Sequence, residues 1–112
     1  MTTVSDCTEV TANSELALRG AAAQQPVSVA IQANQLGFQL YKKGIFSGIC
    51  GTKLDHGVLV TGFGTEDNKG YWYVKNSWGS GWGESGYIRI VRTEGEGQGK
   101  CGIQMAASYP IL

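Results

Sequence analysis

Glycine is the feature that most constrains the fold of this chain, because 17 of its 112 residues are glycine, against a typical share of about 7%. The glycines are spread among aromatic and β-branched residues, and the chain has only two prolines. Glycine permits the tight turns and the close backbone approaches that join short strands. The composition therefore predicts a β-rich domain and argues against a collagen-like or disordered chain.

The charge balance limits the partners of the chain. Lysine and arginine total 9, as do aspartate and glutamate, so the formal net charge is zero. Nucleic acid and acidic membranes both call for a basic excess, and neither is expected as a partner. The first residues, MTTVSDCTEV, lack the basic and apolar regions of a signal peptide. We expect residues 1–112 to form one domain, as is usual at this length.

The segment 11–25 has the composition of a helix. It is rich in alanine, Thr11 or Asn13 can cap its first turn, and Glu15 suits the positive end of the helix dipole. Pro26 disfavours helical geometry in the residue before it. We therefore expect one main helix that ends just before this proline.

The rest of the chain has the pattern of strands and short turns. An edge strand is expected in residues 1–10, and a short helical turn around Leu36 and Leu40 in residues 34–43. The clearer strand candidates are residues 26–32, 57–63, 71–75 and 87–92. One helix followed by antiparallel strands indicates an α+β domain built on an open, barrel-like sheet.

The three cysteines, Cys7, Cys50 and Cys101, allow three pairings for a single disulfide. Cys50 and Cys101 each precede a glycine, which suits a turn where two segments are joined, whereas Cys7 lies in a polar stretch without that context. We favour the Cys50–Cys101 bond and assign Cys7 no functional role. A disulfide indicates that the protein matures in an oxidising compartment.

His56 is the only histidine in the chain, and Asn76 lies in the tryptophan- and glycine-rich segment NSWGSGWGE. These two residue types have complementary roles in nucleophilic catalysis by cysteine. A thiol with a pKa of about 8.5 is a weak nucleophile at neutral pH and needs a histidine to take its proton. The imidazole in turn needs a group that fixes its ring, and an amide oxygen can accept its N–H. A large indole can keep water away from that bond.

The segments DHGV, GYWYVKNSWGSGWGESGYIRI and CGIQMAASYP resemble the C-terminal half of papain-like cysteine proteases, and PVSVAIQ and FQLYKKGIFSGICG fit the same half in the same order. The resemblance covers nearly the whole chain. It implies that His56 is the catalytic general base and that Asn76 orients it. Trp78 would shield their hydrogen bond and line the cleft together with Trp82. Apart from the resemblance, Asp55 is expected to tune the electrostatics of His56, because a nearby carboxylate favours the imidazolium form.

The same resemblance implies a pocket for the substrate side chain two residues before the cut. Its residues in this chain are Ala30, Leu54, Gly57 and Ala106. All four are apolar and three are small, so a Leu, Val or Phe side chain would fit. Burial of such a side chain contributes about 1.5–3 kcal/mol.

The cysteines match the family in one respect and depart from it in another. Cys50 and Cys101 fall at the positions of the family's C-terminal disulfide. The CGSCW-like helix that carries the family's nucleophile is missing from these 112 residues, as is the glutamine of the oxyanion hole. Cys7 does not replace the nucleophile, because it lies in VSDCTEV rather than at a helix start.

The leading interpretation is the C-terminal, barrel half of a papain-like cysteine endopeptidase that is secreted, lysosomal or vacuolar. Its expected partners are a peptide or protein substrate and the N-terminal half, with no cofactor and no metal. We expect these 112 residues to be inactive alone and to self-associate through the side that bears His56 and Trp78. A non-catalytic binding module and a stand-alone folding fragment of the protease are the alternatives.

Overall fold

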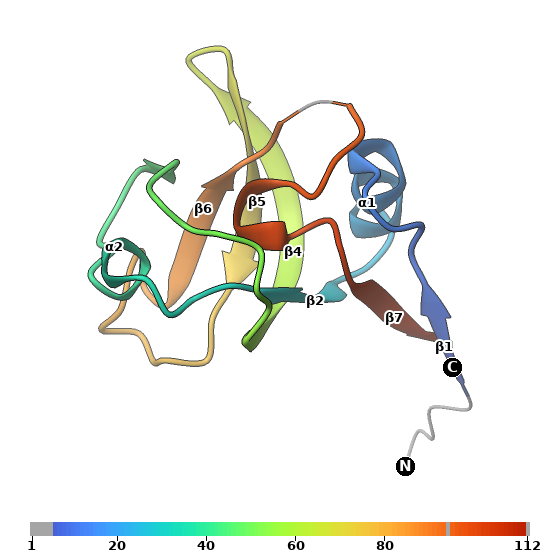
Figure 1. Cartoon of the computed structure of the whole chain (residues 1–112), viewed down its shortest axis with the longest axis horizontal. Helices are drawn as coiled ribbons and strands as arrows, with labels where there is room; N and C mark the ends of the chain where they lie inside the picture. The colour runs from blue at the N-terminus through green and yellow to red at the C-terminus, as the bar shows by residue number, and fades with distance from the viewer. Residues whose placement is uncertain (1–5, 94, 112) are drawn as a thin grey trace.

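The computed structural model describes residues 6–93 and 95–111, which form one sheet with short helices at its two ends. In chain order the elements are β1 (Asp6–Glu9), α1 (Glu15–Ala22), β2 (Val27–Ile31), α2 (Leu36–Gln39), β3 (Ile45–Phe46), β4 (His56–Glu66), β5 (Lys69–Lys75), β6 (Tyr87–Val91), the 3-10 helix η1 (Lys100–Gly102) and β7 (Ala107–Ile111). Figure 1 shows α1 and α2 at opposite ends of the sheet. The central strands between them carry the candidate site.

The described strands form a seven-stranded sheet in the order β1-β7-β2-β4-β5-β6-β3. Their pairings are antiparallel except that of β3 with β6, which is parallel. β4 and β5 form a long hairpin with a register shift between Val60 and Gly62, and such a bulge bends a strand. The predicted α+β class, with an open antiparallel sheet and one main helix, is confirmed. The parallel pairing of β3 was not predicted.

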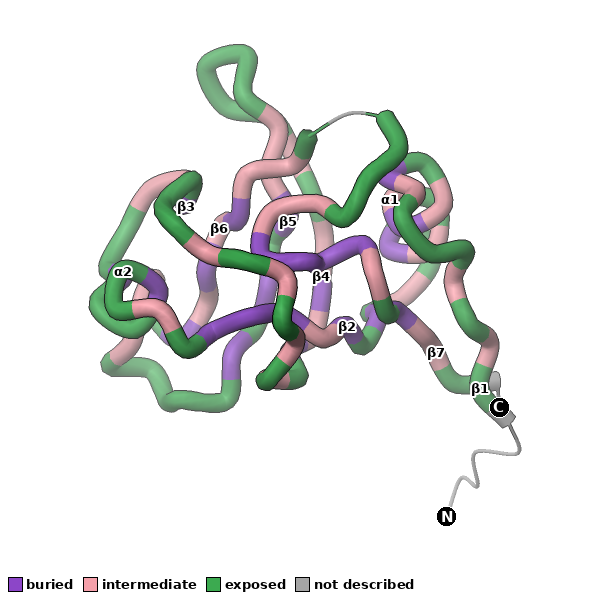
Figure 2. The backbone as a smooth tube through the Cα atoms, viewed as in Figure 1, coloured by how far each residue is buried: buried purple, intermediate pink, exposed green. Residues whose placement is uncertain are grey.

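The core is built from alternate residues of the central strands. In β2, Val27, Val29 and Ile31 are buried while the residues between them are more exposed, as expected for a strand that buries one face. Trp72 of β5 and Ile90 of β6 are fully buried and lie directly opposite each other in the ladder. Figure 2 shows the buried residues gathered in these central strands. The strands therefore form the frame on which the site is placed.

The main helix is shorter than the predicted segment 11–25. Ser14 has an extended backbone and caps α1, because its hydroxyl accepts a backbone N–H of the first turn at 3.1 Å. Neither Thr11 nor Asn13 is the cap. Asn13 has a left-handed φ of 58°, and its N–H donates instead to a carbonyl of the segment before β7 at 2.6 Å. Residues 11–13 thus connect β1 to the helix rather than extend it.

The predicted turn in residues 34–43 contains α2, but it turns a different side chain inward. Phe38 is buried, whereas Leu36 and Leu40 are exposed. A helix of four residues has room for one inward side chain, and the aromatic ring takes that place. β3 and β7 were also not predicted, because β3 has only two residues and β7 contains Pro110, which is unusual inside a sheet.

An acidic residue at the start of α1 is buried rather than solvated. Glu15 is 4% exposed, and its carboxylate lies 2.8 Å from the Arg19 guanidinium and 3.2 Å from that of Arg92. Arg92 also donates to the carbonyl oxygen of Gly64 and lies over the ring of Trp72. The ion pair therefore fastens α1 to β4 and to the segment after β6.

The variant Glu15→Gln is expected to lower the free energy of unfolding by about 2 kcal/mol, because it leaves the buried charge of Arg92 with a neutral partner. Urea denaturation measures this change. Arg19→Gln is the matched control: the Arg19 side chain is 41% exposed and Arg92 still neutralises the Glu15 carboxylate, so a smaller loss of about 1 kcal/mol is expected. Equal losses for the two variants would contradict the assignment of the buried pair as the important one.

Candidate active site

His56 and Asn76 lie at the same end of the sheet because β4 and β5 are antiparallel neighbours. His56 is the first residue of β4, and Asn76 directly follows the last residue of β5. The Nε2 atom of His56 lies 2.7 Å from the Oδ1 atom of Asn76. The predicted catalytic pair is thus in hydrogen-bond contact and is held by two adjacent strands of the frame.

The surroundings of the Asn76 amide fix its orientation. Its Oδ1 atom also accepts the backbone N–H of Ser77 at 2.7 Å. An amide nitrogen in this place would face the backbone N–H of Ser77, which can only donate, so the oxygen must occupy it. The Nε2 atom of His56 therefore carries the proton that is donated to Asn76, and Nδ1 carries the lone pair of the neutral ring. Asn76 is only 5% exposed, so water competes poorly for this bond.

The indole ring of Trp78 packs on His56. The ring of Trp78 lies 5.1 Å from that of His56, with 30° between the planes. Trp82 packs edge-on against Trp78 at 5.2 Å, and its indole N–H donates to the carbonyl oxygen of Gln39 at 3.0 Å. Phe38 contacts both indoles, at 5.6 Å and 5.3 Å. The sequence pattern did not single out Phe38, which supports both tryptophans.

The loop between Asn76 and β6 is closed at its base. The N–H of Asn76 donates to the carbonyl oxygen of Gly86 at 3.0 Å, and the N–H of Gly86 donates to that of Trp82 at 2.8 Å. Gly83 has a φ of 59°, and a Cβ there would lie 2.5 Å from the carbonyl oxygen of Tyr87. Only glycine fits this position. The loop therefore depends on glycine to fold back tightly over the pair.

A carboxylate anchors the same loop. Glu84 accepts hydrogen bonds from Nε and Nη2 of Arg89, both at 2.9 Å, and from the N–H of Gly44 at 3.1 Å. The hydrogen bonds from Arg89 are the main reason that the pKa of Glu84 lies below its ordinary value, and burial opposes them. The same hydrogen bonds raise the pKa of Arg89. Both partners are therefore charged at neutral pH.

Asp55 precedes His56 in the chain, but its carboxylate has a different contact. Its Oδ1 atom accepts the N–H of Ala33 at 2.8 Å, and its own N–H donates to the carbonyl oxygen of Ile31 at 3.0 Å. These bonds hold the turn that follows β2. Across the described residues, no hydrogen bond joins Asp55 to the His56 ring.

Three of the four predicted pocket residues lie together on neighbouring segments. Ala30 is opposite Gly57 in the β2–β4 ladder, and its N–H donates to the carbonyl oxygen of Ala106 at 3.2 Å. Leu54 belongs to the loop before β4, and its side chain reaches over Gly102, where an added Cβ would lie 2.8 Å from the leucine. Small residues thus leave open space beside β2, and Leu54 approaches from the loop.

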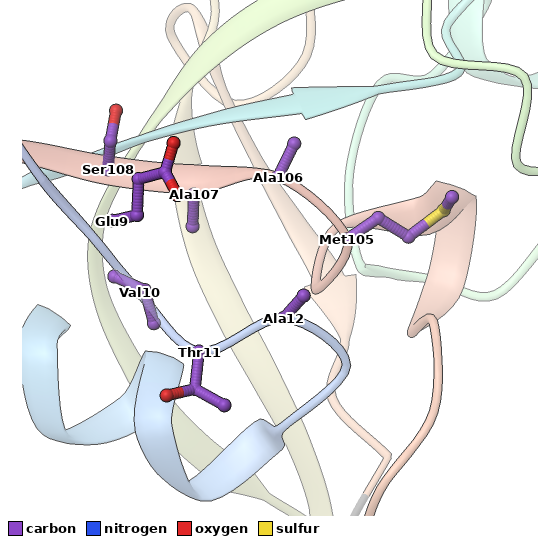
Figure 3. A pocket seen from close by; sticks show the side chains of 8 residues that line it. All are labelled: Glu9, Val10, Thr11, Ala12, Met105, Ala106, Ala107 and Ser108. Carbon is purple, nitrogen blue, oxygen red and sulfur yellow. The ribbon is translucent and has the colours of Figure 1, made fainter.

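Two hollows lie near these residues. One of about 470 Å³ lies between the end of β1 and the start of β7, and Figure 3 shows Ala106 among its lining residues. The other, of about 400 Å³, is lined in part by Gly57 and Asn76. His56 lines neither of the two. The smaller hollow is therefore the one that lies beside the hydrogen-bonded pair, through Asn76.

The Cys50–Cys101 disulfide is present, as predicted. Cys101 is almost fully buried and has a left-handed φ of 59°. Cys7 is exposed on β1 and is outside this bond. The disulfide joins the loop that leads to His56 to the segment that leads to Ala106, so it supports both sides of the candidate site.

Among the described residues, no cluster of three or more histidine, cysteine, aspartate or glutamate side chains could hold a metal ion. In the same part of the chain, no helix has the length and apolar character needed to cross a membrane.

Comparisons with known proteins give the family of the chain. The family described as papain family cysteine protease matches residues 1–111. The chain is 56% identical over 109 residues to the probable cysteine protease RD21B of Arabidopsis thaliana, a match that covers 97% of this chain and 24% of the relative. It is 53% identical over 111 residues to the KDEL-tailed cysteine endopeptidase CEP2 of the same plant, covering 99% of this chain and 31% of the relative.

A solved structure gives the same result for the fold. The bromelain protease from Ananas comosus, in complex with the E64 inhibitor, matches with a TM-score of 0.92 and 45% identity over 97% of this chain and 51% of that one. The sheet and its connections are therefore those of a cysteine protease. The chain belongs to the papain family. It spans about a quarter to a third of the length of the two relatives.

Proposed function

We propose that this chain is the C-terminal part of a cysteine endopeptidase, in which His56 is the general base and Asn76 the residue that orients it. The observation that carries the proposal is the 2.7 Å contact between His56 Nε2 and Asn76 Oδ1 beneath the ring of Trp78. Membership of the papain family supports peptide-bond hydrolysis as the reaction of the complete protein.

In this proposal, Nδ1 of His56 accepts the proton of a cysteine thiol that the N-terminal part supplies. The thiolate attacks the peptide carbonyl to form a thioester, and His56 gives the proton to the amine that leaves as the C–N bond breaks. His56 then takes a proton from a water molecule that attacks the thioester, and it passes this proton to the departing thiolate as the carboxylic acid is released. Asn76 holds the ring with Nδ1 facing the thiol. Trp78 keeps water from the bond between the two residues. The scheme uses protein groups and water and calls for no cofactor.

The proposed substrate is a peptide with an apolar side chain two residues before the cut. Ala30, Gly57 and Ala106 support this specificity, because they are small, apolar and close together. Leu54 would form a further wall of the pocket. Asp55 would act on His56 through its charge and through the turn that it holds.

The proposed partner is the N-terminal part of the protease. These residues contain no CGSCW-like segment, and the relatives are several times longer than this chain. Trp78, Leu36 and Leu40 are exposed and would lie in or near the cleft together with Trp82. In the isolated chain this surface would favour self-association, since large apolar patches seek a partner.

The proposed location is the secretory pathway or the vacuole. A disulfide persists in oxidising compartments. The KDEL tail named for one relative is a signal for retention in the endoplasmic reticulum. These two facts together favour a secreted, lysosomal or vacuolar protease over a cytosolic one.

A non-catalytic module that binds peptides, or a fragment of the protease that folds by itself, is the second candidate. The observation that favours it is the lack of a nucleophile segment in these residues. Both candidates share the fold, so only an assay of cleavage separates them.

Complementation tests the proposal. This chain is co-refolded with the N-terminal half of a papain-family protease that contains the CGSCW segment. The assay measures cleavage of a fluorogenic peptide that carries Leu two residues before the cut. We expect no turnover from this chain alone, and turnover in the mixture. That turnover should disappear after alkylation of the partner's cysteine or in the His56→Ala variant. A well-folded mixture that binds the peptide without cleaving it would favour the binding module.

A further inference from the structure

Glu84 lies at the base of the loop that carries the two indoles, where its backbone is coupled to that of Asn76. The N–H of Glu84 donates to the carbonyl oxygen of Tyr87 at 2.8 Å, and the N–H of Tyr87 donates to that of Glu84 at 3.1 Å. Gly86, inside this short turn, accepts the N–H of Asn76 at 3.0 Å. A displacement of Glu84 would therefore be transmitted to Asn76 through a single turn.

The side chain of Glu84 also contacts the segment that follows α2, which packs against Trp82. Its Oε2 atom accepts the N–H of Gly44, and the carbonyl oxygen of Gly44 accepts the hydroxyl of Tyr41 at 2.6 Å. The ring of Tyr41 packs against Trp82 at 5.5 Å. We name the side chains of Glu84, Arg89 and Tyr41, with the backbone of Gly44, the Glu84 clamp. The Glu84 clamp thus connects the loop that carries Trp82 to the segment after α2, whose Tyr41 ring packs against Trp82.

Arg89 gives the clamp a fixed geometry. It donates two hydrogen bonds to the two carboxylate oxygens of Glu84, each at 2.9 Å, and such bidentate pairs are strong and directional. Its backbone N–H donates to the Tyr41 hydroxyl at 3.4 Å. On the outer side Arg89 also donates to Glu66, whose side chain is 55% exposed. Two acids thus share one arginine, and of the two Glu84 is the one that belongs to the loop.

We propose that Glu84 is a positioning residue for the candidate catalytic pair, because it holds the loop in the place where an indole covers the His56–Asn76 hydrogen bond. The contacts run from the clamp to Trp82, from Trp82 to Trp78 at 5.2 Å, and from Trp78 to His56 at 5.1 Å. The inference rests on the proposed roles of the pair. Its claim concerns geometry, however, and can be tested without catalysis.

The test is the rate at which the Nε2 proton of His56 exchanges with water, measured by NMR in this chain. Exchange requires local opening of the hydrogen bond. Glu84→Gln removes the ion pair but keeps the volume of the side chain, and it is expected to raise the rate about tenfold, which corresponds to the loss of a hydrogen bond to a charged group. Glu66→Gln removes the outer partner of the same arginine and is expected to change the rate by less than about twofold.

Two further variants make the result decisive. Arg89→Lys keeps the charge but loses the bidentate geometry, and it is expected to raise the rate roughly threefold, since part of the bonding energy remains. It decides the question if Glu84→Gln does not fold. Val27→Ala weakens the core away from the loop and is expected to leave the rate within about twofold, because local opening does not depend on global stability.

The proposal is overturned if Glu84→Gln, or Arg89→Lys in its place, exchanges at the wild-type rate. It is also overturned if Glu66→Gln or Val27→Ala raises the rate as much as the clamp variants do, because the effect would then be general. Failure of the complementation assay would leave these exchange rates unchanged. The positioning role and the proposed catalysis can therefore fail separately.

Discussion

Replacing Cys50 and Cys101 together by alanine is expected to lower the free energy of unfolding by about 4 kcal/mol. The two cysteines are 51 residues apart, and the figure follows from the chain entropy that a closed loop of this size removes from the unfolded state. The bond also joins the loop before β4 to η1, where Leu54 reaches over Gly102. Urea denaturation without reductant measures the loss.

Cys7→Ser is the matched control, because the side chain of Cys7 is exposed and outside the bond. It is expected to change the free energy of unfolding by less than about 0.5 kcal/mol, as most surface substitutions do. Wild-type chain in strong reductant should behave like the double variant. A double variant that is as stable as the wild type would show that the bond constrains the unfolded chain far less than its loop length suggests.

The central strands β2, β4, β5 and β6 were predictable because they bury one face, and burial of one face leaves a period of two in the sequence. The alternation of Val27, Val29 and Ile31 marks β2, and the structure buries all three. The parallel pairing of β3 left no such mark, because two residues carry no measurable period. Its place depends on contacts with β6 that are distant in sequence.

The limits of the main helix were not predictable from propensity alone. Thr11, Asn13 and Ser14 are all good capping residues, and local sequence does not choose among them. The choice is tertiary: the N–H of Asn13 donates to a carbonyl near β7, and its backbone has a φ of 58° instead of the extended conformation of an N-cap, so Ser14 caps the helix. A contact that is distant in sequence also explains why Glu15 is buried. Its partner Arg92 comes from the far end of the chain.

The candidate pair could be found from the sequence, but the groups that hold it could not. His56 and Asn76 were identified through a resemblance of long segments, and the structure brings them into contact. Phe38 and Glu84 carry no chemical signature of their own. They matter because α2 and the loop before β6 meet at the tryptophans, and that meeting is a property of the fold.

In the complete protease, His56→Ala is expected to lower kcat/KM by about 10⁴, the upper range for the loss of a general base. The upper range applies because the same imidazole would also generate the thiolate. Asn76→Ala is expected to lower kcat/KM by about 10²-fold, because the ring keeps its proton-accepting nitrogen but loses the hydrogen bond that fixes it, worth about 1.5–3 kcal/mol. Both losses are expected in kcat, since neither side chain belongs to the proposed pocket.

Tyr73→Phe is the control for these kinetics. Tyr73 is exposed and stacks on Tyr87, outside the proposed machinery, so its kcat and KM should match the wild type. The relative size of the losses in His56→Ala and Asn76→Ala decides whether Asn76 only orients the imidazole ring. If Asn76→Ala costs as much as His56→Ala, the amide does more than orient the ring. If the loss falls on KM instead, the pair binds substrate and the base must be sought elsewhere. A hundredfold gap within kcat is the result that an orienting amide and a proton-accepting imidazole require.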